Sequence, residues 1–222
     1  MRSRHEGLGV AGSQGLRTTR MEAFSDGVFA IAITLLVLDI AVPAGSEAHL
    51  LQSVLDEWPS YLAYFVSFAT IGAAWLLHSV ITEYLDHADS LFLRLNLLLL
   101  LVVSFLPFPT KLIAESLGST DPERVAATIY GVNLLLAAGL LALLWRYATR
   151  SGLLRTDIAD EDRSILTRRL TPGLAGYLVL IVIGLFWPTA AVVGYLAIAF
   201  FFIVPLPSRV RRAYPPGPGA TG

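Results

Sequence analysis

Six long apolar blocks, separated by short polar segments, constrain this chain more than any other feature of its sequence. Of its 222 residues, 55% are hydrophobic and only 15% are charged, whereas soluble domains carry about 25% charged residues. A helix of about 20 apolar residues is long enough to cross a bilayer. The blocks therefore predict an all-α integral membrane protein rather than a soluble protein with a large core.

The blocks predict six transmembrane helices within a single domain over residues 19–206. We expect these helices at about 19–41, 59–82, 91–114, 124–148, 171–186 and 188–206. Pro107 and Pro109 are expected to bend or unwind the last part of the third helix. The flanking segments 1–18 and 207–222 are rich in Gly, Pro, Ser and Arg and are expected to be disordered cytoplasmic ends.

The basic residues predict how the chain is oriented in the membrane. With six spans, all but two of the sixteen Lys and Arg residues fall on the side of the two termini, the exceptions being Lys111 and Arg124. The positive-inside rule makes that side cytoplasmic. We therefore expect a multi-pass protein of the cell inner (plasma) membrane with both termini in the cytoplasm.

The sequence gives little support for an enzyme, a cofactor or a nucleic-acid partner. Cysteine is absent, so there are no thiolate metal ligands or cysteine nucleophiles. The four His residues are scattered, and neither His-x-x-x-His nor Gly-x-Ser-x-Gly occurs. The net charge of −1 does not suggest binding to nucleic acid. We expect the lipid bilayer as a partner, and no cofactor and no bound metal.

The first helix has two unlike faces. At about 100° per residue, one apolar stripe with a single hydroxyl lies within about 40° of one line; its members are Gly27, Ile31, Thr34, Leu35 and Leu38. Asp26 points away from this stripe. Because an acid within a membrane helix is costly unless it is paired or faces water or protein, Asp26 implies a partner.

The predicted topology places several polar residues at one depth, near the cytoplasmic side. They are Ser25, Asp26, Trp75, His78, Arg94 and Asn96. We expect His78 or Asn96 to donate to the Asp26 carboxylate, and Arg94 to snorkel or to pair with Asp26 or Glu83. Such a layer either fixes helix packing or serves as a proton relay or an ion site.

Three motifs resemble those of the transmembrane protein 175 family of potassium channels, in its prokaryotic branch. The first helix carries Arg20-x-x-x-Phe24-Ser25-Asp26-Gly27-Val28-Phe29-Ala30-Ile31-Ala32-Ile33-Thr34-Leu35-Leu36. The second and third carry Trp75-x-x-His78 and Arg94-x-Asn96-Leu97. The number of spans and the overall length agree as well, and the resemblance covers about residues 19–206.

The resemblance implies a homotetramer around a central pore that the first helix of each subunit lines. Ile31 would form the narrowest apolar ring and the gate, with Leu35 and Leu38 as further rings toward the outside, and Thr34 would supply a hydroxyl layer that affects selectivity. The family pattern also implies a supporting polar network, which would comprise Arg20, Phe24, Ser25, Asp26, Trp75, His78, Arg94 and Asn96. Potassium would be the main permeant ion, with Na⁺, Cs⁺ and Rb⁺ as further candidates.

Two other functions compete with this hypothesis. A proton- or cation-coupled secondary transporter would use Asp26 and His78 as titrating groups, although the sequence shows no inverted repeat and no pair of broken helices. A non-conducting membrane scaffold is the second alternative. A channel of this kind would select ions without a Thr-Val-Gly-Tyr-Gly filter, which the sequence lacks.

Overall fold

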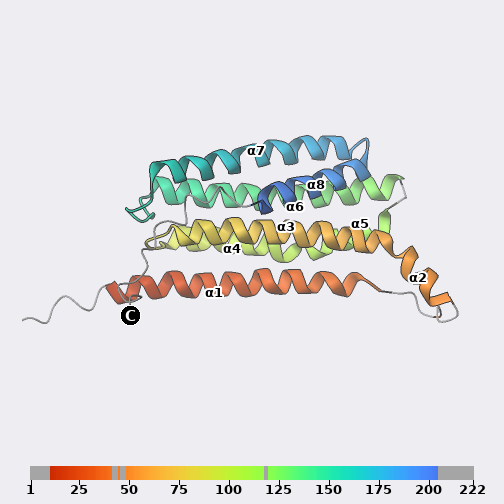
Figure 1. The fold of residues 1–222 in the computed structure, drawn as a ribbon, viewed down its shortest axis with the longest axis horizontal. Helices are drawn as coiled ribbons and strands as arrows, with labels where there is room; N and C mark the ends of the chain where they lie inside the picture. Colours follow the sequence, from red (N-terminus) through yellow and green to blue (C-terminus); the bar gives the residue numbers. More distant parts are fainter. Residues whose placement is uncertain (1–10, 42–44, 46–48, 118–119, 205–222) are drawn as a thin grey trace, which may run out of the picture.

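The fold is a bundle of roughly parallel and antiparallel helices, seen in a computed structural model (Figure 1) that describes residues 11–41, 45, 49–117 and 120–204. Helix α1 lies at one edge of the bundle and α7 at the opposite edge, with the other long helices between them. The helices are α1 (Ala11–Leu35), the 3-10 helix η1 (Leu36–Asp39), α2 (Leu50–Asp56), α3 (Trp58–Glu83), α4 (Ser90–Phe105), α5 (Pro107–Ser116), α6 (Thr120–Arg150), α7 (Asp160–Gly184) and α8 (Pro188–Ile203).

The predicted all-α membrane fold is confirmed. Five helical stretches of the described chain are long and apolar enough to cross a membrane. They are Thr18–Asp39, Trp58–Glu83, Ser90–Ser116, Asp121–Arg150 and Asp160–Gly184. The sixth apolar helix, α8, has 16 residues, which corresponds to about 24 Å and is shorter than a hydrocarbon core of about 30 Å.

The ends of the chain differ in part from the expected disorder. Helix α1 begins at Ala11, so residues 11–18 are helical instead of disordered. Residues 1–10 and the expected tail at 207–222 lie outside the described residues.

Helix α7 begins at Asp160, well before the expected start at residue 171. Its first turn carries Asp160, Glu161 and Asp162, which lie between the expected fourth and fifth helices, at 124–148 and 171–186. Negative side chains at this position favour a helix because the N-terminal end of the helix dipole is positive. The same charges that suggest a loop by composition therefore stabilise the start of a helix.

The expected third helix is divided into α4 and α5 at Leu106. Pro107 follows it and opens α5, because proline lacks the N–H that would continue the α4 hydrogen-bond ladder and is well suited to a first helical position. Asp89 caps the start of α4 by accepting from the Phe92 N–H at 2.8 Å. The Tyr147 hydroxyl of α6 also donates to Asp89. These two donors, the hydroxyl first, hold the pKa of Asp89 below its usual value.

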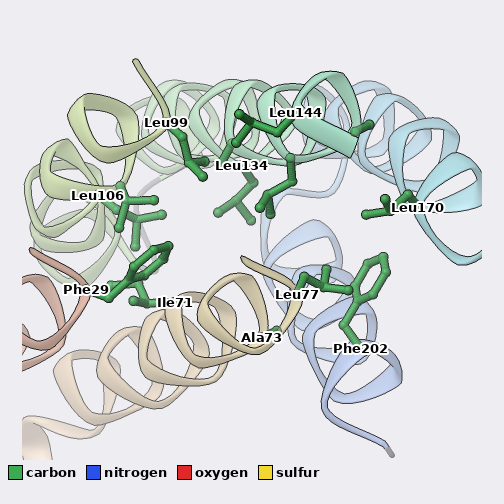
Figure 2. Packing of buried hydrophobic residues seen from close by; sticks show 14 of the residues in the cluster. Phe29, Ile71, Ala73, Leu77, Leu99, Leu106, Leu134, Leu144, Leu170 and Phe202 are labelled. Atoms are coloured by element: carbon green, nitrogen blue, oxygen red, sulfur yellow. The ribbon is translucent and has the colours of Figure 1, made fainter. Parts of the chain in front are cut away.

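The core lies where α3, α4, α6, α7 and α8 meet, and α1 adds Phe29 to it (Figure 2). Lipid tails are as apolar as leucine, so in a membrane close packing holds helices together more than hydrophobic burial does. Gly131 of α6 shows how tight the fit is: a Cβ there would overlap the hydroxyl of Tyr195 on α8. The same holds for Gly194, where a Cβ would overlap Leu180 of α7.

Helix α8 ends near the middle of the bundle, whereas its neighbours α6 and α7 extend farther on that side (Figure 1). Its last carbonyl groups accept hydrogen bonds from Arg169 of α7. The Nη2 of Arg169 donates to Phe201 O at 2.7 Å, to Phe202 O at 3.1 Å and to the carbonyl of Val204. The guanidinium also lies over the Phe201 ring, 5.5 Å from its centre.

Candidate functional site

One face of α1 packs against the bundle. It consists of residues spaced four, four, three and four apart, as expected for one side of a helix; they are Met21, Ser25, Phe29 and Ala32 of α1 and Leu36 of η1, which continues α1, and all are buried. They face α3 and α4, the helices with which α1 makes most of its contacts. The Phe29 ring lies 5.4 Å from the ring of His78 on α3. This packing fixes the rotation of α1 about its own axis.

The opposite face of α1 is exposed from Arg20 onward and continues into η1. Ile31 is 60% exposed, Leu35 42% and Leu38 71%, and Thr34 between them is exposed as well. The Thr34 hydroxyl donates to the Ile31 carbonyl at 2.9 Å, so its lone pairs remain available on this face. We call Ile31, Thr34, Leu35 and Leu38 the α1 stripe.

Arg20 and Phe24, which we expected in the polar network, belong to the exposed face instead. They continue the α1 stripe toward the N-terminus, because Arg20, Phe24, Gly27 and Ile31 follow one another at spacings of four, three and four residues. All four are exposed. Among the described residues, Arg20 makes no hydrogen bond to Asp26, His78 or Asn96.

Ser25, Asn96 and His78 form one buried hydrogen-bonded chain across three helices. The Asn96 amide nitrogen on α4 donates to the Ser25 hydroxyl at 2.9 Å, and that hydroxyl donates to Met21 O at 2.8 Å. The other end of the Asn96 amide, its Oδ1, lies 2.8 Å from His78 Nε2 on α3. An amide oxygen only accepts, so Nε2 carries the proton and donates. We call this set the buried polar chain.

Asp26 has a different partner from those expected. Trp75 Nε1 on α3 donates to its carboxylate at 2.9 Å, whereas His78 and Asn96 are engaged in the buried polar chain. The reason is geometric: Asp26 is turned by about 100° from Ser25, which brings it to the flank of α1 rather than to its buried face. The side chains of Asp26 and Trp75 are both exposed in the single chain.

Arg94 belongs neither to the buried polar chain nor to the Asp26–Trp75 pair. It is exposed on α4, and the hydrogen bonds and ion pairs found in the described part of the chain include none from Arg94 to Asp26 or Glu83. The described residues also contain no group of three His, Cys, Asp or Glu side chains that could hold a metal ion.

A second polar feature lies beside the Leu38 end of the α1 stripe. A pocket of about 420 Å³ is bordered by Leu38 and by residues from α2, α3 and α5. Its charged members are Asp39, Asp56, Glu57, Lys111 and Glu115. Lys111 and Glu115 lie 3.8 Å apart. Negative charge therefore predominates at this end of the stripe.

Comparison with known proteins places the chain in a family. Residues 20–107, which hold the α1 stripe and the buried polar chain, match the family model described as "Endosomal/lysosomal potassium channel TMEM175". A protein of Streptomyces collinus named as a potassium channel is 41% identical over 201 residues, which are 87% of this chain and 97% of that protein. A protein of Chamaesiphon minutus with the same description is 43% identical over 192 residues, 82% of this chain and 93% of that one.

A solved structure agrees with these sequence matches. The crystal structure of a lysosomal potassium-selective channel TMEM175 homolog from Chamaesiphon minutus superposes with a TM-score of 0.76 at 38% identity. It covers 84% of this chain and 96% of that one. With a shared helical fold and relatives that it matches over nearly their whole length, this chain belongs to the TMEM175 family.

Proposed function

We propose that this chain is a potassium-permeable cation channel, in which four copies assemble so that α1 of each copy lines a central pore. The observation that carries the proposal is the α1 stripe, which is exposed although the opposite face of the same helix is packed. The relatives named as potassium channels support potassium as the permeant ion. Na⁺, Cs⁺ and Rb⁺ are further candidate ions, and no cofactor takes part.

The proposed gate is a set of apolar rings. Four copies of Ile31, 60% exposed in the single chain, form the narrowest ring, with Leu35 and Leu38 beyond it toward the outside. A narrow apolar ring expels water and thereby blocks ions, and a small rotation or spreading of the helices rewets it. The Thr34 hydroxyls, whose lone pairs are available, replace part of the ion's hydration beside the ring.

The buried polar chain and the Asp26–Trp75 pair support this pore from behind. Both link α1 to the helices outside it, through Asn96 on α4 and through Trp75 and His78 on α3. Such contacts resist rotation of α1 about its own axis, so they hold the stripe toward the pore. With the arginine-rich end of the bundle inside the cell, as the positive-inside rule requires, both termini are cytoplasmic and the membrane is the cell inner (plasma) membrane.

Replacement of apolar ring residues by asparagine tests the proposal. Ile31→Asn and Leu35→Asn should hydrate the constriction and raise the leak of potassium, measured as flux into liposomes that hold the purified protein and as single-channel current. Leu178→Asn is the matched control. Leu178 is 54% exposed but lies on α7, at the edge of the bundle opposite α1 (Figure 1).

Each alternative function predicts a different result. Ile31→Asn and Leu35→Asn variants that conduct as the wild type does would show that the pore runs elsewhere. Liposomes without any cation flux would favour a non-conducting scaffold. Flux that saturates with the cation and requires a proton gradient would favour a secondary transporter with Asp26 and His78 as its titrating groups.

A further inference from the structure

An apolar groove runs along the outside of the bundle between α4 and α6. It has a volume of about 480 Å³ and exposes Leu101 and Phe105 from α4 and Val132 and Leu136 from α6. This volume lies within the range of small-molecule sites, about 300 to 1,000 Å³. Because the chain is inserted in a membrane, such a groove meets either lipid or another protein.

Arginine residues extend both walls of this groove at the same end. On α4, Arg94, Leu98, Leu101 and Phe105 follow one another at spacings of four, three and four residues, so they share one face. Leu98, Leu101 and Phe105 are 49%, 64% and 49% exposed, and Arg94 is exposed as well.

The α6 wall has the same layout. Val132, Leu136, Leu143 and Arg150 are spaced by four, seven and seven residues and are all exposed. Arg146 is exposed one turn before Arg150. Among the hydrogen bonds and ion pairs of the described residues, none involves the guanidinium of Arg94, Arg146 or Arg150, whereas Arg155 pairs with Asp157 at 2.6 Å.

Two cross-links fix the register of these walls. Asn133 Nδ2 on α6 donates to Val102 O on α4 at 3.2 Å in the middle of the groove. The Tyr147 hydroxyl on α6 donates to Asp89, the cap of α4, at its end. The two helices are therefore antiparallel and in contact along the groove, and the start of α4 lies beside the last turns of α6. This places Arg94, Arg146 and Arg150 together at one end of the apolar surface.

We propose that this groove holds an anionic phospholipid, with an acyl chain between α4 and α6 and the phosphate at the three arginines. Lipid tails are as apolar as the groove, so the apolar contact alone does not favour one lipid over another. Preference must come from the headgroup. Arginine offers a planar fork of donors that matches phosphate oxygens, and these three have no carboxylate partner in the described part of the chain. The proposal does not depend on ion conduction.

Lipid binding to the purified protein tests this proposal. The protein in detergent is titrated with phosphatidylglycerol and with phosphatidylcholine of the same acyl chains, and bound lipid is counted by native mass spectrometry. We expect the wild type to bind phosphatidylglycerol more tightly. Arg94→Gln/Arg150→Gln should lose about fivefold in that affinity for each arginine removed, and added salt should weaken the wild type in the same direction.

The matched control removes the same charge at the same end of the bundle. Arg155→Gln/Arg163→Gln neutralises two arginines that already pair with Asp157 and Asp160, and it should keep the wild-type preference. Equal affinity of the wild type for both lipids, or equal loss in both double variants, would overturn the proposal.

A single cysteine tests whether the grooves of two copies of the chain face each other. Because the chain has no cysteine, Val132→Cys places one thiol in the groove. Disulfide-linked dimers of this variant in the membrane would mean that another copy covers the groove, and would overturn the proposal. A monomer under oxidising conditions, with Val132→Trp binding less phosphatidylglycerol than Leu178→Trp does, is the result that supports a lipid.

Discussion

At the scale of single residues, the buried polar chain has a definite proton arrangement. His78 Nε2 donates to Asn96 Oδ1, and His78 Nδ1 is buried with no hydrogen-bond partner in the described part of the chain. A second proton on Nδ1 would therefore be buried without an acceptor, and the neutral ring fits its surroundings. The arrangement favours the packing interpretation of this layer over the proton relay, because the chain of donors starts at His78, whose Nδ1 has no partner in the described part of the chain, and ends at the Met21 carbonyl.

Asn96→Leu tests how much the buried polar chain contributes to stability. The substitution keeps the size of the side chain but leaves His78 Nε2 without its acceptor. We expect a loss of about 0.6 to 1.7 kcal/mol in the free energy of unfolding, which are about the average and the maximum for hydrogen bonds between membrane helices. Chemical unfolding of the purified protein in detergent micelles provides the measurement.

A double-mutant cycle with His78→Phe is the control for this prediction. If the two side chains interact as the structure shows, His78→Phe/Asn96→Leu will be less destabilised than the sum of the single variants, because no unpaired donor remains. Strict additivity of the two losses would contradict the interaction.

At the scale of helices, α8 depends on a side chain from its neighbour. A helix end in hydrocarbon leaves carbonyl groups without partners, which is costly because no water can reach them. Arg169 satisfies three such carbonyls at the end of α8. This explains how a helix of only 16 residues ends within the bundle.

Arg169→Met should destabilise the fold at the end of α8. We expect the free energy of unfolding to fall by about 1.5 to 3 kcal/mol, the usual contribution of hydrogen bonds to a charged group. This loss should appear as a lower unfolding midpoint of the detergent-solubilised protein. Arg168→Met is the matched control, since Arg168 is the neighbouring, exposed arginine on the same helix. Equal midpoints for the two variants would show that Arg169 does not cap α8.

The sequence predicts the helical membrane fold because long apolar blocks leave few other solutions. Helical spacing also identifies the stripe from Ile31 to Leu38 as one face of the first helix, but its role at a pore came only from the family resemblance. The predicted start of α7 was too late, because Asp160, Glu161 and Asp162 look like a loop by composition. These acids stabilise a helix because they lie in its first turn, at the positive end of the helix dipole. The sequence also missed Trp75 as the partner of Asp26, because matched depth does not specify which residue faces which across two helices.

At the scale of the whole molecule, the helix that carries the α1 stripe lies at one edge of the bundle (Figure 1). In this stripe the Thr34 hydroxyl lies among the exposed apolar side chains of Ile31, Leu35 and Leu38. The groove between α4 and α6 is a separate surface, with Leu101 and Val132 on its walls. The two surfaces therefore suit different neighbours: other copies of the chain at α1, and lipid at the groove.

Cysteine cross-linking tests which surface faces other copies. A disulfide requires Cα atoms within about 7 Å, so Ile31→Cys in a narrow ring should give disulfide-linked dimers on oxidation in the membrane. Each thiol forms one bond, so dimers are the largest linked species even within a tetramer. Leu178→Cys is the control on α7, at the opposite edge of the bundle and similarly exposed; it should remain monomeric. Dimers from Leu178→Cys together with monomers from Ile31→Cys would contradict a pore lined by α1, because the copies would then meet at α7.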